Sequence, residues 1–362
     1  MEYNSYRRKS RPVFAGKTKI GGDAPILVQS MLCTDPHDAN ACIAMCRALE
    51  EAGCGMIRMT IPDKEAVGVI AKIKEAGISV PLVADIHFDY RLALEACAAG
   101  IDKIRINPGN IGAPERVRAV AAACAARRIP IRIGVNSGSL EKHLLVKYGA
   151  PTPQALAQSA LWHAALLEQC DFTDIVLSVK ASDVRTMIAA NRILAQKCDY
   201  PLHLGVTEAG TRRIGSLKSA AGIGALLADG IGDTIRVSLT DDPVCEVEDA
   251  RAILEAMELL PGGVIHVVSC PTCGRTKIPL IALVNEFERR AKEEIHRKTP
   301  LKVAIMGCIV NGPGEAREAD IGLAGGTDEA VIFRGAQMLC RVSPDKAIDT
   351  LLFYIGQIPE KS

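Results

Sequence analysis

Three cysteines and one glutamate near the C-terminus have the types and spacing of metal ligands. Cys270 and Cys273 form a CxxC pair in the segment SCPTCGR, and Cys308 opens the segment CIVNGPGE, which ends at Glu315. Thiolates on such turns can hold one metal ion or one face of an iron–sulfur cluster, while backbone N–H groups offset their charge. Three thiolates leave one position for a weaker oxygen ligand, and Glu315 is the candidate.

Two other interpretations of these cysteines stay open at this point. Cys-Pro-x-Cys-Gly is also a zinc knuckle, but zinc needs four ligands, and without a second CxxC it would have to recruit His266 or His296. The cysteines could also be plain core residues, as we expect for Cys340 and for most of the thirteen cysteines of the chain. The motif favours the iron–sulfur interpretation.

Composition narrows the class of protein. The formal net charge of +1 suggests no nucleic-acid partner and no membrane-surface partner, and no apolar run approaches the length of a membrane span. The first eleven residues are polar and basic, unlike a signal peptide, and the cysteine pattern suits a reducing compartment. We therefore expect a cytoplasmic protein, and 362 residues should form two domains.

Short apolar runs alternate with Ala-rich helical patterns over the first 260 residues. The expected strands are 26–29, 56–59, 82–85, 103–106, 131–135, 174–179, 202–206 and 234–238. The expected helices are 38–52, 64–76, 90–98, 114–127, 153–169, 182–196, 211–228 and 244–259. Uninterrupted apolar strands alternating with helices indicate a parallel sheet, and eight units in this length predict an α/β fold of the (β/α)8 TIM-barrel type. A doubly wound open sheet is the alternative, but no Gly-rich dinucleotide turn follows the first strand.

The alternation ends at Pro261-Gly262-Gly263, which we interpret as a linker. The predicted domains are thus a barrel, 1–260, and a small α+β iron–sulfur domain, 264–362. In the second, we expect strands 264–268, 301–306, 320–323 and 330–334, and helices 279–297 and 344–355.

Polar residues gather where the barrel strands end, which is where barrel active sites lie. They are Arg58, Asp85, Arg105, Asn107, Arg132, Asn136, Lys180, Glu208, Arg236 and Ser238. One such arginine is more often an ion-pair partner, but five cations on successive strands favour a bound diphosphate. A Schiff-base lysine at position 180 is the competing interpretation. We expect His37, His143 and His163 at the surface or in loops.

Several segments together are similar to the 4-hydroxy-3-methylbut-2-enyl diphosphate synthase family of the methylerythritol phosphate pathway, in its compact bacterial form. Besides the two cysteine motifs they are VADIH at 83–87, RINPGNIG at 105–112, RIGVNSGSL at 132–140 and VTEAG at 206–210. The first twenty or so residues carry no such signal.

The resemblance implies a 4Fe–4S cluster held by Cys270, Cys273 and Cys308, with Glu315 on the fourth iron. It implies reductive ring opening of 2-C-methyl-D-erythritol 2,4-cyclodiphosphate, with Glu208 as the acid/base carboxylate and with the polar residues of the strand ends around the diphosphate. It also implies flavodoxin or ferredoxin as electron donor, and a homodimer in which the cluster domain of one chain caps the barrel of the other. A barrel lyase with a structural zinc tail and an electron-transfer protein are the alternatives.

Overall fold

The computed structural model describes residues 6–260, 265–309, 318–327, 329–335 and 337–360, without the side chain of Ser139. The chain divides into two compact units, Met1–Leu259 and Leu260–Ser362. Glu315 and the Pro261-Gly262-Gly263 turn lie outside the described residues.

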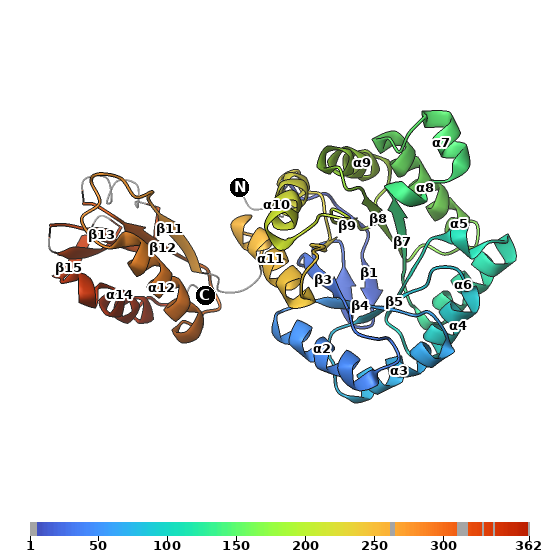
Figure 1. The fold of residues 1–362 in the computed structure, drawn as a ribbon, viewed down its shortest axis with the longest axis horizontal. Coiled ribbons are helices and arrows are strands. Elements are labelled where there is room, and N and C mark those ends of the chain that lie inside the picture. Colours follow the sequence, from blue (N-terminus) through green and yellow to red (C-terminus); the bar gives the residue numbers. More distant parts are fainter. Residues whose placement is uncertain (1–5, 261–264, 310–317, 328, 336, 361–362) are drawn as a thin grey trace. The chain divides into compact units, whose positions relative to one another are not determined.

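The first unit is a closed barrel of eight parallel strands, as the sequence predicts. The strands are β3 (Leu27–Met31), β4 (Met56–Thr60), β5 (Leu82–Asp85), β6 (Lys103–Ile106), β7 (Ile131–Asn136), β8 (Ile175–Lys180), β9 (His203–Leu204) and β10 (Thr234–Ile235). Their order in the sheet is β8-β7-β6-β5-β4-β3-β10-β9, and a parallel bridge between Leu177 and Leu202 closes the ring. Figure 1 shows the helices of this unit arranged around the strands.

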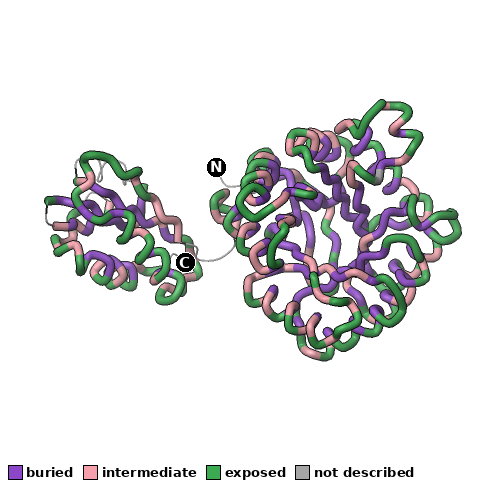
Figure 2. The backbone as a smooth tube through the Cα atoms, viewed as in Figure 1, coloured by how far each residue is buried: buried purple, intermediate pink, exposed green. Residues whose placement is uncertain are grey.

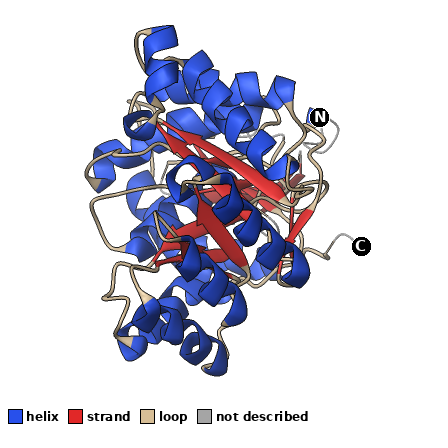
Figure 3. Ribbon diagram, turned by 90° about the vertical axis from the view of Figure 1, so that its right-hand side faces the viewer, coloured by secondary structure: helices blue, strands red, loops and turns tan. Residues whose placement is uncertain are grey.

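Eight helices follow the eight strands in turn. They are α2 (Ala39–Glu51), α3 (Lys64–Glu75), α4 (Tyr90–Ala98), α6 (Pro114–Arg127), α8 (Pro153–Glu168), α9 (Val184–Lys197), α10 (Arg212–Ala228) and α11 (Pro243–Ala256). Aspartates cap several of them: the side chains of Asp38, Asp63 and Asp183 each accept a hydrogen bond from a backbone N–H of the first turn. The view in Figure 3 shows the strands enclosed by helices.

The loops and the last two strands differ from the prediction. Two short helices, α5 (Pro108–Ile111) and α7 (Lys142–Tyr148), lie in the loops after β6 and β7. Strands β9 and β10 are only two residues long. Pairing ends where Gly205 passes so close to the neighbouring strands that an added Cβ would lie 2.6 Å from the Arg236 carbonyl oxygen and 2.8 Å from Lys180 Nζ.

An N-terminal hairpin, which the sequence left unassigned, closes one end of the barrel. Strands β1 (Val13–Ala15) and β2 (Thr18–Ile20) pair antiparallel. Their apolar side chains pack against Met56, Val83 and Val176, which lie near the beginnings of three barrel strands. The hairpin therefore fills the N-terminal end of the barrel, and the opposite end is the one where barrel active sites lie.

In its described residues, the second unit has a five-stranded sheet and two α-helices. Strands β11 (Ile265–Ser269), β12 (Leu301–Met306) and β13 (Ile321–Gly325) are parallel, and β14 (Ala330–Arg334) and β15 (Gln337–Val342) continue the sheet antiparallel. Helices α12 (Leu280–Glu294) and α14 (Ala347–Gly356) form the core with the sheet around Phe287 and Leu351. The buried residues run along the strands in both units (Figure 2). Strand β15 was not predicted, because its apolar run, Met338–Cys340, is short, and all of its residues are exposed or half-buried.

None of the helices in the described part of the chain has the length and apolar character needed to span a membrane.

Candidate active site

The cations at the strand ends point into the barrel because side chains alternate along a strand. The parallel register pairs Arg105 on β6 with Arg132 on β7, and Asn136 on β7 with Lys180 on β8. Residues in register on neighbouring strands point to the same face of the sheet. The fold thus collects residues that are far apart in sequence at one end of the barrel, which we call the mouth.

Asp85 organises two of the arginines at the mouth. Its carboxylate is fully buried, with Oδ2 at 2.6 Å from Arg58 Nη2 and Oδ1 at 3.0 Å from Arg105 Nη1. Burial alone would raise the pKa of Asp85, but the adjacent Arg58 and Arg105 cations outweigh it and hold the pKa below its usual value. Asp85 therefore stays ionised and orients both guanidinium groups.

Arg132 and Lys180 lie deeper in the barrel, and no carboxylate among the described residues forms an ion pair with either of them. Arg132 is only 1% exposed, and its Nε and Nη2 atoms have no hydrogen-bond partner within the part of the chain that the structure describes. Burial, followed by the neighbouring Arg58 and Arg105 charges, lowers the pKa of Arg132. Burial and the nearby Arg236 also lower the pKa of Lys180 well below its ordinary value. An anion bound here would stabilise both cations.

Lys103 is a further buried cation that sequence reasoning missed. It lies two residues before Arg105 on β6 and hence on the same inward face, fully buried, with Nζ at 3.4 Å from Met56 Sδ. Burial and the charge of Arg132 lower its pKa. The period-2 alternation of a strand could have identified it once Arg105 was placed inward.

The inside of the barrel carries an excess of cationic groups. Arg236 is held by Glu246 of α11, with Nε to Oε2 and Nη2 to Oε1 both at 3.2 Å, and Ser30 Oγ donates to the same carboxylate at 2.9 Å. Among the described residues, the carboxylates in ion pairs with the inward cations are Asp85 and Glu246. The inward cations are Arg58, Lys103, Arg105, Arg132, Lys180 and Arg236. Such an excess in a low-dielectric site favours a multiply charged anionic ligand.

The remaining predicted residues border this region. Asn107, directly after β6, is 3% exposed and its Oδ1 has no hydrogen-bond partner among the described residues. Asn136 ends β7, and Ser238 lies two residues beyond Arg236, both partly buried. Glu208, in the loop after β9, is exposed and has a φ of 53°. A non-glycine residue in the left-handed region is strained, and such strain is often kept at functional positions.

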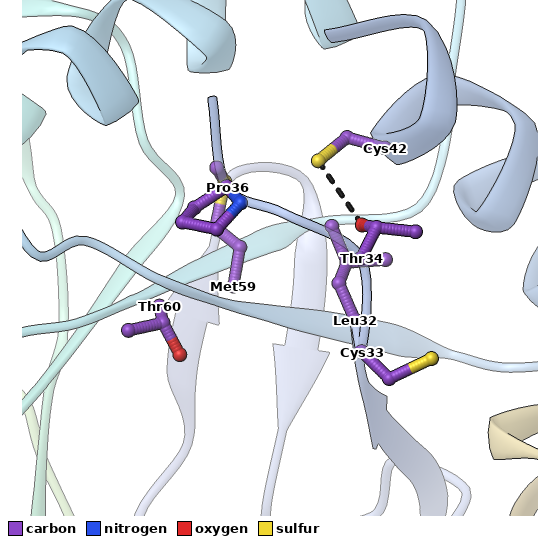
Figure 4. Close-up of a pocket in the computed structure, with 7 residues that line it drawn as sticks. All are labelled: Leu32, Cys33, Thr34, Pro36, Cys42, Met59 and Thr60. Carbon is purple, nitrogen blue, oxygen red and sulfur yellow. Dashed lines mark hydrogen bonds between the residues drawn. The ribbon is translucent and has the colours of Figure 1, made fainter. Parts of the chain in front are cut away.

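A small cavity lies beside the mouth, at the ends of β3 and β4. It has a volume of about 270 Å³ and is lined by Leu32, Cys33, Thr34, Pro36, Cys42, Met59 and Thr60. Figure 4 shows Cys42 on its helix with its thiol hydrogen-bonded to the Thr34 hydroxyl at 3.2 Å. The lining has no charged side chain, so this cavity does not suit a phosphate.

The predicted cysteine ligands of the second unit lie at the carboxyl ends of two neighbouring strands, which we call the cysteine edge of the sheet. Cys270 follows the last residue of β11, and Gly307 and Cys308 follow the last residue of the neighbouring parallel strand β12. Gly307 N–H donates to Cys270 Sγ at 3.2 Å, and Lys277 N–H donates to the Gly307 carbonyl at 3.0 Å. The two cysteine segments are therefore joined by hydrogen bonds of the Gly307 backbone, one to a cysteine sulfur and one from the Lys277 backbone.

The donor chemistry at this edge fits an iron–sulfur cluster. Hydrogen bonding from Arg275, first from its backbone and then from its side chain, lowers the pKa of the exposed Cys273 thiol, which favours the thiolate that iron binds. Among the described residues, no three His, Cys, Asp or Glu side chains are grouped closely enough to hold a metal ion.

The expectation for His163 was wrong. This side chain is not at the surface or in a loop but fully buried on α8, where it hydrogen-bonds to two loops at the mouth. Neither it nor Glu246 carried a sequence signal, because both belong to helices and reach their partners only through the closed barrel.

Both units match one family over most of their length. The GcpE TIM-barrel domain matches residues 10–251, and the GcpE protein C-terminal domain matches residues 266–357. A relative from Caldanaerobacter subterraneus, named 4-hydroxy-3-methylbut-2-en-1-yl diphosphate synthase (flavodoxin), is 56% identical over 96% of each chain. One of the same name from Ruminiclostridium cellulolyticum is 52% identical over 97% of this chain and 98% of its own.

Solved structures with low sequence identity share the barrel alone. Type I 3-dehydroquinate dehydratase from Clostridium difficile has a TM-score of 0.52 at 12% identity and covers 69% of this chain and 98% of its own. Dihydropteroate synthase from Yersinia pestis has a TM-score of 0.50 at 15% identity and covers 68% of this chain and 98% of its own. The full-length matches, together with the barrel and the second unit, show that this chain belongs to the GcpE family of enzymes.

Proposed function

We propose that this chain opens the ring of 2-C-methyl-D-erythritol 2,4-cyclodiphosphate reductively and releases 4-hydroxy-3-methylbut-2-enyl diphosphate and water. The substrate takes up two electrons and two protons in total. The ring C–O bond to phosphate breaks, one hydroxyl group leaves as water, and a C=C bond forms. The observation that carries this proposal is the excess of cations in the barrel, above all Arg132 with its unpartnered Nε and Nη2.

The chain's own residues bind the diphosphate and stabilise its growing charge. Arg58, Arg105, Arg132, Lys180 and Arg236 are proposed to bind phosphate oxygens, with Asn107, Asn136 and Ser238 as neutral donors. As the ring C–O bond breaks, charge accumulates on the freed phosphate, and cations fixed in a buried site stabilise it without rearranging. Asp85 positions Arg58 and Arg105 for this role. This geometry supports Asp85 as a residue that orients the arginines.

Glu208 is proposed as the group that moves a proton at the substrate. It is exposed on the loop after β9, at the mouth end of the barrel. Its backbone has a left-handed conformation, which is strained for a residue other than glycine. In its protonated form, this carboxyl group would donate a proton to a leaving hydroxyl group, which is otherwise a poor leaving group in neutral water.

Cys270, Cys273 and Cys308 are proposed to hold a 4Fe–4S cluster, with Glu315 on the fourth iron. Such a cluster, when bound, supplies single electrons and a Lewis-acidic iron. Flavodoxin is the proposed electron donor, because the names of the relatives specify it, and ferredoxin is the alternative. The thirteen free thiols support a reducing, cytoplasmic setting.

A homodimer is proposed to bring cluster and substrate together. Helix α11 runs back along the barrel, so the chain leaves the barrel near Leu259, at the end opposite the mouth. The linker would have to lead back along the barrel for the chain's own cluster domain to reach this mouth. We therefore propose that the cluster domain of a second copy caps it. Sedimentation of the purified protein tests this arrangement, and a monomer that turns over substrate at low concentration would exclude it.

The overall proposal is tested with protein purified without oxygen. We expect a brown protein that bleaches with dithionite, contains iron and sulfide, and converts the cyclic diphosphate to the open-chain diphosphate with reduced flavodoxin. Zinc in place of iron, without this conversion, would favour instead a barrel lyase that uses the Lys180 amine, whose pKa is lowered by burial.

A further inference from the structure

His163 is a buried side chain that connects two loops at the barrel mouth. It lies on the inner face of α8 and is fully buried. The Gly109 N–H donates to its Nδ1 at 3.2 Å, so the ring proton is on Nε2, which donates to Glu141 Oε1 at 2.5 Å. Burial opposes the ionisation of Glu141, but its hydrogen bonds, of which the one from His163 contributes most, together outweigh burial and lower the pKa of that carboxyl group.

The first loop is the one that carries Asn107. Gly109 lies in the first turn of α5, where a backbone N–H has no partner within the helix, and His163 supplies the missing acceptor. A Cβ added at Gly109 would lie 2.6 Å from His163 Cε1, so only glycine allows this approach. The position of α5, and with it that of Asn107, is therefore set by the imidazole.

The second loop is the one that follows Asn136. Glu141 immediately precedes α7 and comes shortly after the turn Ser137–Ser139, which begins where β7 ends. Strands β6 and β7 are neighbours in the barrel, so the two loops emerge side by side. Figure 1 shows α5, α7 and α8 on the same side of the barrel.

The rest of the inner face of α8 can pack without this histidine. Leu156, Ala160 and Leu167 are fully buried on the same helix and supply its apolar contacts. A polar ring with both nitrogens hydrogen-bonded to separate loops adds little to that packing, but it fixes the distance between the loops.

We propose that His163 is a positioning residue, which holds the loop of Asn107 and the loop after Asn136 at the spacing that the diphosphate requires. The inference rests on the proposed function, because it takes both asparagines as diphosphate contacts. Small displacements of binding groups weaken binding strongly, so loss of the connection should raise the Kd for the cyclic diphosphate by about 10- to 100-fold.

Three substitutions at position 163 separate the two hydrogen bonds. His163→Leu removes both and fills a similar volume. His163→Asn places an acceptor near the Nδ1 position and keeps the bond to Gly109, whereas His163→Gln places a donor near the Nε2 position and keeps the bond to Glu141. We expect the largest rise in Kd, measured by calorimetry on the full chain with the cyclic diphosphate, for leucine, and partial rescue by asparagine and glutamine.

Two further variants avoid the buried position in case His163→Leu does not fold. Glu141→Ala removes one hydrogen bond at a partly exposed side chain, and Gly109→Ala forces the loop away from the imidazole. Both should raise the Kd and KM in the same direction as His163→Leu, with kcat less affected.

Asn191→Leu is the matched control. Asn191 is also fully buried on a barrel helix, and its Nδ2 donates two hydrogen bonds, to the Val179 and Met187 carbonyls, without reaching a mouth loop. We expect it to lower the melting temperature and leave the Kd unchanged. If His163→Leu, Glu141→Ala and Gly109→Ala fold and all bind the cyclic diphosphate with the Kd of the parent protein, the inference is overturned. If Asn107→Ala and Arg132→Met also keep the Kd of the parent protein, the proposed diphosphate site itself is wrong.

Discussion

Replacement of Cys270, Cys273 or Cys308 by serine is expected to abolish both iron binding and turnover. Each thiol is a proposed ligand, and serine is a hard oxygen donor that binds cluster iron far more weakly than thiolate. The domain itself should stay folded, because its core is formed by apolar side chains around Phe287 and Leu351. Iron and sulfide analysis, the visible spectrum and circular dichroism of each variant measure this outcome.

Cysteines outside the site provide the control for this experiment. Cys340→Ser on β15 and Cys33→Ser at the barrel cavity should keep the iron content of the parent protein. Glu315→Ala should keep most of the cluster and lose most of the turnover, if a displaceable oxygen ligand is its role. An empty site in Cys340→Ser, or full iron in Cys273→Ser, would contradict the proposed ligand set.

The barrel was predictable because its signals are local and repeated. Each buried strand is a short apolar run, and each following helix begins with its own cap or proline, as at Asp63 and Pro114. The family description of residues 10–251 as a TIM-barrel domain confirms that fold. The strand pattern then predicted a common location for Arg58, Arg105 and Arg132, although Arg132 is the second residue of β7 and lies deeper than the other two.

What could not be predicted depends on contacts between distant parts of the chain. The hairpin of β1 and β2 is too short for a hydrophobic pattern, and it is stabilised by packing on Val83 and Val176, far along the sequence. His163 resembles any helical histidine until the barrel brings Gly109 and Glu141 to its two nitrogens. Such roles follow from tertiary structure, and a single sequence contains no local signal for them.

Arg132→Met is expected to weaken substrate binding without destabilising the protein. Methionine keeps most of the buried volume, so no large cavity forms, and it removes a cation that is 1% exposed and surrounded by like charges. The ligand-free melting temperature should therefore be unchanged or higher. Loss of one charge-assisted contact should cost about 1.5–3 kcal/mol of binding free energy, or roughly ten- to a hundredfold in Kd.

Arg7→Met provides the contrasting control, because Arg7 is a buried arginine with a structural partner. Its Nη2 lies 3.1 Å from Oδ1 of Asp233, which directly precedes β10 and so lies at the end of the barrel away from the mouth. Removal of one partner of a buried ion pair typically costs about 3–5 kcal/mol of folding free energy, so Arg7→Met should melt at a lower temperature and bind the cyclic diphosphate as the parent does. Thermal denaturation with and without the cyclic diphosphate separates the two arginines. If Arg132→Met lost stability like Arg7→Met and kept the full ligand-induced rise in melting temperature, Arg132 would be a structural residue and the diphosphate would have to bind elsewhere.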